Sequence, residues 1–250
     1  MNRQRRFTLI YLLVLLTVFS GGTGWAANLK CGQLLIGRAG ISRAIKWNLF
    51  VTGRTLSEYR QGLHKDFNSS LQALKFNETW IDLGAGKGNA AIDYLKEITA
   101  THTSANVVLI AYKLDRWFNL PKFNNKLSVI EGRLFEEIPS VEIPKAKLIT
   151  DYYGVLSYTR DLSRTLALVF DRLEVGGELY IHSLNSSTLI DFQNKVYSMT
   201  DFLKQIDGLR VEGTNGILKI TKLREDVQFS ELRLTRLIEE EIPAFRRFSY

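Results

Sequence analysis

The chain has 250 residues, of which 45% are hydrophobic and 24% charged, and its formal net charge is +7. This composition is typical of a globular protein and excludes a disordered, collagen-like or repeat-dominated chain. The single cysteine excludes an intramolecular disulfide and a cysteine-built zinc site, and three scattered histidines leave little for a histidine-built one. We therefore expect one hydrophobic core and no structural metal.

The N-terminus has the pattern of a signal peptide. Three arginines in the first six residues precede an uncharged run from Phe7 to Ser20, rich in Leu, Val, Ile and Phe. Gly24-Trp25-Ala26 supplies the small residues that signal peptidase needs at positions −3 and −1. We predict that residues 1–26 are a signal peptide that exports the protein, to the periplasm or the medium. An uncleaved N-terminal membrane anchor is the alternative, because the uncharged stretch continues to Ala27.

Residues 27–55 form a basic N-terminal extension. Lys and Arg recur from Lys30 onwards, and Glu58 is the only acid before Asp66. Apolar residues at helical spacing from Ile41 to Leu49 predict a short basic amphipathic helix. Such a helix either packs on the domain, as most amphipathic helices do, or lies on an anionic membrane surface.

The next predicted element is a helix over Leu56–Leu74. It begins with Thr55-Leu56-Ser57-Glu58, which has the spacing of a capping box. One apolar stripe follows at Leu63, Phe67, Leu71 and Leu74. We expect this stripe to face the core.

A series of short apolar runs then predicts buried strands. These runs are Thr79 to Leu83, Val107 to Tyr112, Leu127 to Glu131, Leu148 to Asp151 and Leu179 to Ser183. Helical patterns separate most of them, and such crossovers are typical of parallel strands.

The C-terminal part has a different pattern. Leu209 to Glu212 and Ile217 to Leu223 are separated by the turn sequence Gly213-Thr214-Asn215-Gly216. A third strand-like run, Ser230 to Leu237, follows without room for a helix. We therefore expect an α/β fold whose mostly parallel sheet has an antiparallel C-terminal edge.

The segment Trp80-Ile81-Asp82-Leu83-Gly84-Ala85-Gly86-Lys87-Gly88-Asn89 lies between a predicted strand and a helix. Its glycines allow the backbone to turn tightly and to approach a ligand without an intervening Cβ. Dinucleotide-binding proteins use a different spacing, G-x-G-x-x-G. An acid two residues before the first glycine would repel a pyrophosphate but accepts hydrogen bonds from a cationic amino group. The pattern therefore favours S-adenosylmethionine.

This segment resembles motif I of the class I S-adenosylmethionine-dependent methyltransferases, with Asp82, Gly84, Gly86 and Gly88 at the motif positions. Leu173 to Ile181, which contains Gly176-Gly177, is similar to the turn by which that family enters its fifth strand. The resemblance covers about Leu56 to Leu237. It implies a Rossmann-like methyltransferase domain over residues 56–250, with a seven-stranded sheet.

The resemblance also implies which residues bind the cofactor. They are Asp82, Gly84, Ala85, Gly86, Gly88, Asn89, Asp115, Leu134 and Asp151. Tyr112 or Lys113 stands where the family usually has an acid for the ribose hydroxyls, and Asp115 comes slightly later. Arg133 follows Gly132 where the family has an acid that contacts the adenine amine. Loss of both charge-assisted hydrogen bonds would weaken cofactor binding roughly one hundredfold or more.

Methyl transfer mainly requires alignment of donor and acceptor, so no universal catalytic residue is expected. Asp151 is placed where the family often has acceptor-facing groups, and Tyr152, Tyr153 and Tyr158 either form an aromatic wall near the sulfonium or pack ordinarily. Asp151-Tyr152-Tyr153-Gly154 lacks the Pro-Pro that many methyltransferases of nucleic-acid nitrogens carry, which disfavours a nucleic-acid partner. No role is predicted for the histidines, because no acidic or nucleophilic residue accompanies them at a recognisable spacing.

Two functional hypotheses follow. The first is methyl transfer to a small-molecule or lipid acceptor near a membrane. The second is a non-catalytic exported binding protein on the same fold, since a fold does not by itself imply activity. The intact motif I favours the enzyme, whereas Tyr112 and Arg133 favour the binding protein.

Overall fold

The computed structural model describes residues 53–101, 105–112, 125–159, 161–182, 188–192, 195–214, 216–229 and 233–236. The predicted signal peptide, almost all of the basic extension and Asp115 lie outside these ranges. Among the helices that the structure describes, none is long and apolar enough to cross a membrane.

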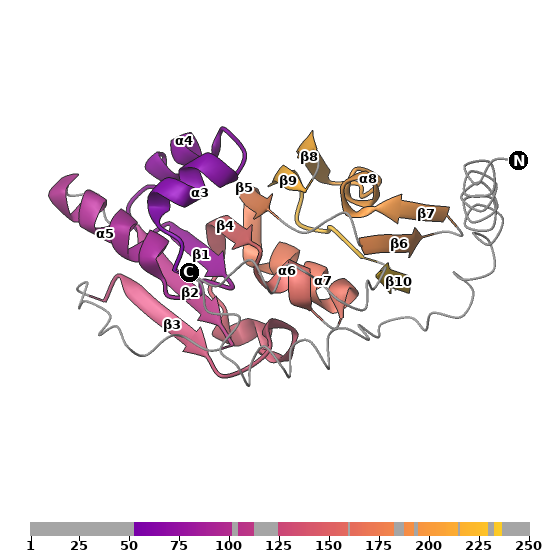
Figure 1. Ribbon diagram of the computed structural model, residues 1–250, viewed down its shortest axis with the longest axis horizontal. Helices are drawn as coiled ribbons and strands as arrows, with labels where there is room; N and C mark the ends of the chain where they lie inside the picture. Colours follow the sequence, from indigo (N-terminus) through magenta and orange to yellow (C-terminus); the bar gives the residue numbers. More distant parts are fainter. Residues whose placement is uncertain are drawn as a thin grey trace, which may run out of the picture.

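A seven-stranded sheet forms the centre of the fold, in the order β3-β2-β1-β4-β5-β9-β8 (Figure 1). Its strands are β1 Thr79–Leu83, β2 Asn106–Ala111, β3 Leu127–Glu131, β4 Ala146–Tyr152, β5 Leu173–His182, β8 Leu209–Thr214 and β9 Ile217–Lys222. Strands β1 to β5 pair in parallel, whereas β9 is antiparallel to both β5 and β8. The predicted mostly parallel sheet with an antiparallel C-terminal edge is confirmed.

Helices cover both faces of this sheet (Figure 1). The helical segments are α3 Leu56–Gly62, α4 Phe67–Gln72, α5 Asn89–Thr101, η3 Phe135–Glu137, η4 Ser140–Glu142, α6 Val155–Tyr158, α7 Leu162–Arg172 and α8 Met199–Leu203. The buried residues of α3, α4 and α5 pack in one cluster with Trp80, and those of α6, α7 and α8 pack in the other with Ile81 and Leu83. This alternation along β1 follows from the two-residue period of a strand.

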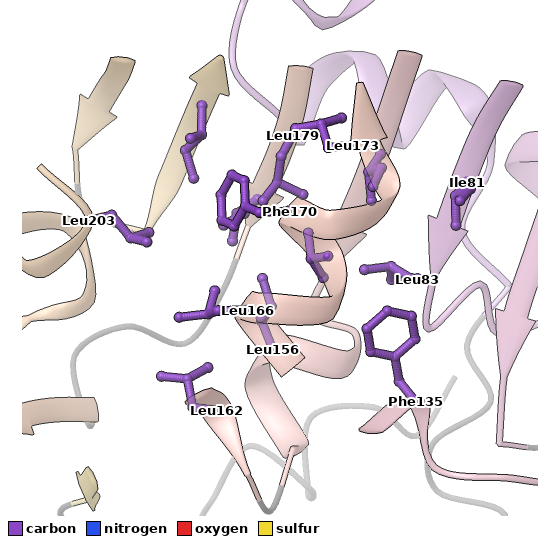
Figure 2. Packing of buried hydrophobic residues seen from close by; sticks show 14 of the residues in the cluster. Ile81, Leu83, Phe135, Leu156, Leu162, Leu166, Phe170, Leu173, Leu179 and Leu203 are labelled. Carbon is purple, nitrogen blue, oxygen red and sulfur yellow. The ribbon is translucent and has the colours of Figure 1, made fainter. Parts of the chain in front are cut away.

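The cluster that contains Ile81 and Leu83 is built around α7 (Figure 2). Leu166 and Phe170 of α7 are buried there with Leu83 at the end of β1 and Phe135 of η3. This packing fixes the end of β1 and the segments that follow β3 and β4, because Leu83, Phe135 and Leu156 all belong to the cluster.

The predicted single helix over Leu56–Leu74 is wrong, because the chain forms α3 and α4 with a break after Gly62. The capping box at Thr55 and Glu58 and the burial of the apolar stripe are confirmed. Leu63, however, has an extended backbone, with φ −88° and ψ 174°. A Cβ on Gly62 would lie 2.1 Å from the Tyr152 hydroxyl oxygen, so contact with β4 requires glycine here. Glycine also disfavours continuation of a helix.

The placement of the last predicted strand at the antiparallel edge of the main sheet is also wrong. Strand β10, Arg233–Arg236, pairs with β6, Thr188–Phe192, which pairs with β7, Lys195–Ser198. These three strands form a separate antiparallel sheet. The hairpin of β6 and β7 has an unpaired edge of its own, and β10 satisfies that edge.

Candidate functional site

The motif I loop connects β1 to α5 and turns tightly, as its glycines predict. Gly84, Gly86 and Gly88 have φ values of +69°, +57° and +72°, in the left-handed region that favours glycine. The backbone N–H groups of Gly84 and Ala85 donate to the Ile110 carbonyl oxygen, at 2.8 and 3.3 Å. The loop is thereby fixed against the carboxyl end of β2.

Asp82, the motif I acid, is wholly buried within β1. The Tyr59 hydroxyl lies 3.0 and 3.1 Å from its two carboxylate oxygens, and the Thr150 hydroxyl donates to Oδ1 at 2.7 Å. The Trp80 indole N–H in turn donates to Thr150 Oγ1 at 2.9 Å. An ionised carboxylate has about four acceptor positions, so these two hydroxyl protons leave part of its capacity unused.

Asp151 lies at the carboxyl end of β4, in register with Leu83 of β1. The two predicted acids therefore lie on neighbouring strands at the same end of the sheet. The Gly154 N–H donates to Asp151 Oδ1 at 3.0 Å, and the Leu156 N–H donates to Oδ2 at 2.8 Å. Asp151 thus holds the turn that follows β4, which the sequence does not reveal.

Burial raises the pKa of Asp82 and of Asp151 to about 7. For Asp82, the hydrogen bonds from Thr150 and Tyr59 oppose this effect, as does the positive charge of Arg54. For Asp151, the backbone hydrogen bonds and Arg54 oppose it, whereas the charge of Asp82 adds to it. A second cation at this end of the sheet would favour the ionised form of both carboxyls.

The motif I loop lies directly against the turn after β4. A Cβ on Gly84 would lie 2.5 Å from the Gly154 Cα, and a Cβ on Gly154 would lie 2.2 Å from the Leu83 carbonyl oxygen. Side chains at either position would separate the two segments. The sequence marks Gly154 only as the glycine that follows Asp151-Tyr152-Tyr153.

The Tyr152 and Tyr153 rings contact a positively charged side chain of the same protein. The Arg54 guanidinium carbon lies 4.7 Å from the centroid of the Tyr152 ring and 5.3 Å from that of Tyr153. Arg54 Nη1 also donates to the Tyr152 carbonyl oxygen at 3.1 Å. The sequence leaves open whether these rings form an aromatic wall near a sulfonium or pack ordinarily. In the structure the Arg54 guanidinium lies over both rings. The Tyr158 side chain lies outside the described residues.

Arg54 belongs to a segment that crosses the start of α5. The Asn89 side-chain amide donates to the Gly53 carbonyl oxygen at 3.1 Å. Asn89, predicted to bind the cofactor, therefore ties Gly53 and Arg54 to the motif I loop. The sequence identified Arg54 only as a member of the basic extension.

Tyr112 and Arg133 are the two residues that stand where the family usually has acids. Tyr112 follows β2 directly and is 43% exposed, and its carbonyl oxygen accepts from the Gly132 N–H at 3.0 Å. Arg133 donates to Glu142 through Nη1 and Nη2 of its guanidinium, the first at 3.0 Å. Leu134 is half-buried and precedes η3. Neither position offers the acid that the resemblance implies.

No protein-family model matches this chain, and no curated protein matches its sequence. Its fold is a Rossmann-like α/β fold with a seven-stranded, mostly parallel sheet and antiparallel edge strands. Similar solved structures include MnmC2 from Aquifex aeolicus, with a TM-score of 0.42 and 15% identity over 66% of this chain and 58% of that one. The chain thus spans 58% of the length of that protein.

Two further solved structures are similar at the same level. Precorrin 8w decarboxylase from Methanobacterium thermoautotrophicum has a TM-score of 0.40 and 17% identity, over 75% of this chain and 94% of that one. A putative protein-L-isoaspartate O-methyltransferase from Plasmodium falciparum, in complex with S-adenosyl-L-homocysteine, has a TM-score of 0.35 and 14% identity. The match covers 64% of this chain and 72% of that one. These likenesses concern the fold.

Proposed function

We propose that this protein transfers a methyl group from S-adenosylmethionine to a small-molecule or lipid acceptor. The observation that carries the proposal is the loop of three left-handed glycines, Gly84, Gly86 and Gly88, between β1 and α5. This loop contacts the turn after β4 at the carboxyl end of the sheet. Ligands of open α/β sheets bind outside that end.

The residues at this end of the sheet fit a ligand that carries charges of both signs. The buried carboxyls of Asp82 and Asp151 favour a cation beside β1 and β4. The N-terminus of α5 follows the glycines and favours an anion such as a carboxylate. S-adenosylmethionine combines an ammonium, a sulfonium and a carboxylate, and when bound it supplies an electrophilic methyl group. The chain's own residues would hold and orient it.

The second candidate is a binding protein without catalytic activity. Two observations favour it: Tyr112 occupies the position of the ribose-binding acid, and Arg133 is paired with Glu142. Both candidates predict cofactor binding, and only the first predicts turnover.

Calorimetry of the purified full-length protein tests the shared part of both candidates. We expect binding of S-adenosylmethionine and of S-adenosylhomocysteine, each with one site per chain. Slow hydrolysis or transfer of a labelled methyl group would then favour the enzyme over the binding protein. Absence of heat with either compound, in a protein shown to be folded, would contradict both candidates.

Gly86→Val is expected to fold but to lose cofactor binding, by about one hundredfold or more. The branched side chain would fill space beside the ligand, and the φ of +57° adds backbone strain. Gly86→Asn is the matched control, because asparagine tolerates the left-handed region and adds a side chain with less strain. Both variants should therefore bind weakly, with Gly86→Asn closer to the wild type in melting temperature. Wild-type affinity in either folded variant would refute the cofactor site.

We further propose that the protein is exported, or else held at a membrane by its N-terminal run. Export separates the chain from the cytoplasm, where S-adenosylmethionine is made, and basic residues from Lys30 to Lys46 would attract anionic lipid if the run stays as an anchor. We expect mass spectrometry of the native protein to find an N-terminal peptide that begins at Ala27. Recovery of Met1 to Arg6 in a membrane-bound fraction would overturn export and favour the anchor.

A further inference from the structure

We propose that Tyr153 and His182 form the proton-accepting site for the methyl acceptor, and that this acceptor is a weakly acidic hydroxyl compound such as a phenol. The inference rests on the proposed methyltransferase function and adds to it the class of acceptor. Tyr153 would contact the acceptor hydroxyl, and His182 would act through Tyr153 as a positioning residue and proton sink.

The two residues are joined through both backbone and side chains at the carboxyl ends of β4 and β5. The Tyr153 N–H donates to the His182 carbonyl oxygen at 2.7 Å, and Tyr153 Oη lies 2.7 Å from His182 Nε2. Tyr153 has a φ of +52°, a conformation that a tyrosine rarely adopts. Such backbone strain persists where surrounding contacts impose it, and it is frequent at functional sites.

The direction of this hydrogen bond depends on the protonation of the His182 ring. Burial lowers the pKa of His182, as does the charge of Arg54, and a lowered pKa favours the neutral ring. Nδ1 is buried and makes no hydrogen bond of standard geometry within the described residues. We assign the ring proton to Nδ1, so that Nε2 is the bare nitrogen and accepts from the Tyr153 hydroxyl.

The described residues packed around His182 include one side chain that can exchange a proton with its Nε2, the Tyr153 hydroxyl. Tyr152 and Tyr153 contact its ring, and their centroids lie 4.8 and 4.4 Å away. On the other side, β9 places Ile217 opposite His182, and isoleucine does not titrate. Burial raises the pKa of Tyr153, and the positive charge of Arg54, which lies over its ring, opposes this effect. The phenol thus lies between a neutral base and a fixed cation.

Tyr153 is also next to the proposed cofactor site, since the adjacent Gly154 contacts Gly84 of the motif I loop. In the proposed step, a lone pair of the acceptor oxygen forms a bond to the methyl carbon. The electrons of the broken carbon–sulfur bond remain on sulfur, which becomes a neutral thioether. The acceptor proton passes to Tyr153 Oη as the Tyr153 proton passes to His182 Nε2, which yields an imidazolium.

The experiment compares two probes that differ in their need for a base, 4-methylphenol and 4-methylbenzenethiol. The full-length protein is supplied with S-adenosylmethionine labelled in the methyl group. The thiol is largely ionised at neutral pH, whereas the phenol, like tyrosine, has a pKa of about 10. We expect Tyr153→Phe and His182→Asn to lower transfer to the phenol about one hundredfold, the usual effect of losing a general base. Transfer to the thiol should change less than about threefold.

Two further readouts separate proton transfer from a structural role. In the wild type, transfer to the phenol should rise as pH rises through the His182 pKa, and His182→Asn should abolish that step. Nitrogen NMR of the histidine rings should show a hydrogen-bond acceptor at His182 Nε2 that Tyr153→Phe removes. His64→Asn is the matched control, because His64 lies beside Asp66 and Tyr180 and should leave both activities unchanged.

The inference would be overturned if Tyr153→Phe and His182→Asn lost transfer to phenol and thiol equally, or lost neither. It would also be overturned if the wild type bound the cofactor but methylated only the thiol, or neither probe. Calorimetry with S-adenosylhomocysteine distinguishes a failure of this inference from a failure of the proposed methyltransferase function. A wild type that binds no cofactor would refute the methyltransferase itself. Normal binding without the phenol effect would refute only the role of Tyr153 and His182.

Discussion

Asp82→Asn is expected to lower the affinity for S-adenosylmethionine about one hundredfold and, at the same time, to make the protein more stable above pH 7. The asparagine carbonyl oxygen can still accept from both Tyr59 and Thr150, because both hydroxyls lie within hydrogen-bond distance of Oδ1. The variant therefore keeps the local structure but loses the negative charge that would attract a cationic ligand.

The gain in stability follows from the direction of the pKa shift. Burial raises the pKa of Asp82 from 3.8 in the unfolded chain to about 7 in the folded one. Between these values the folded state binds more protons than the unfolded state, so the free energy of unfolding falls as pH rises. Above pH 7 the full cost of the buried charge is present. Asparagine avoids it, and we expect a gain of about 1–3 kcal/mol at pH 8.

The same ionisation predicts how cofactor binding depends on pH. In the wild type, affinity for S-adenosylmethionine should increase as pH rises through about 7, because the ionised carboxyls of Asp82 and Asp151 attract it. Asp82→Asn should weaken this dependence. Calorimetry and urea unfolding between pH 5 and 9 check both effects, with the exposed Asp207→Asn as control. Wild-type affinity, or lower stability at pH 8, would contradict the assignment.

Gly154→Ala is expected to destabilise the fold by about 2–4 kcal/mol, mainly through a steric clash. The new Cβ would lie 2.2 Å from the Leu83 carbonyl oxygen and 3.2 Å from the Gly84 Cα. The β1 and β4 ends would have to separate. Because Asp151 accepts from the Gly154 N–H, the buried carboxyl would also lose a donor.

Gly132→Ala provides the opposite case and is the matched control. Gly132 has a φ of +89°, but a Cβ there would meet no atom within 4 Å. We expect only the cost of the left-handed backbone, about 1 kcal/mol. Denaturant unfolding of both variants compares the free-energy cost of the steric clash with that of the left-handed backbone. A Gly154→Ala protein as stable as Gly132→Ala would show that the two loops do not touch as described.

Several features of the fold and site could be predicted because they depend on neighbouring residues. The bounds of β1 and β3 follow from short apolar runs, and the β8–β9 hairpin follows from its turn sequence. The left-handed turns at Gly84, Gly86 and Gly88 follow from the alternation of glycine itself. Such local patterns determine the type of element and the position of a turn.

Only the tertiary structure decided which distant residues meet. The helix ends at Gly62 because Tyr152 lies against it, and β10 leaves the main sheet because β6 offers an unpaired edge. The pairing of Tyr153 with His182 depends on the register between β4 and β5. Strand register and close backbone approach are set by packing between segments far apart in the chain, and no periodicity within one segment encodes them.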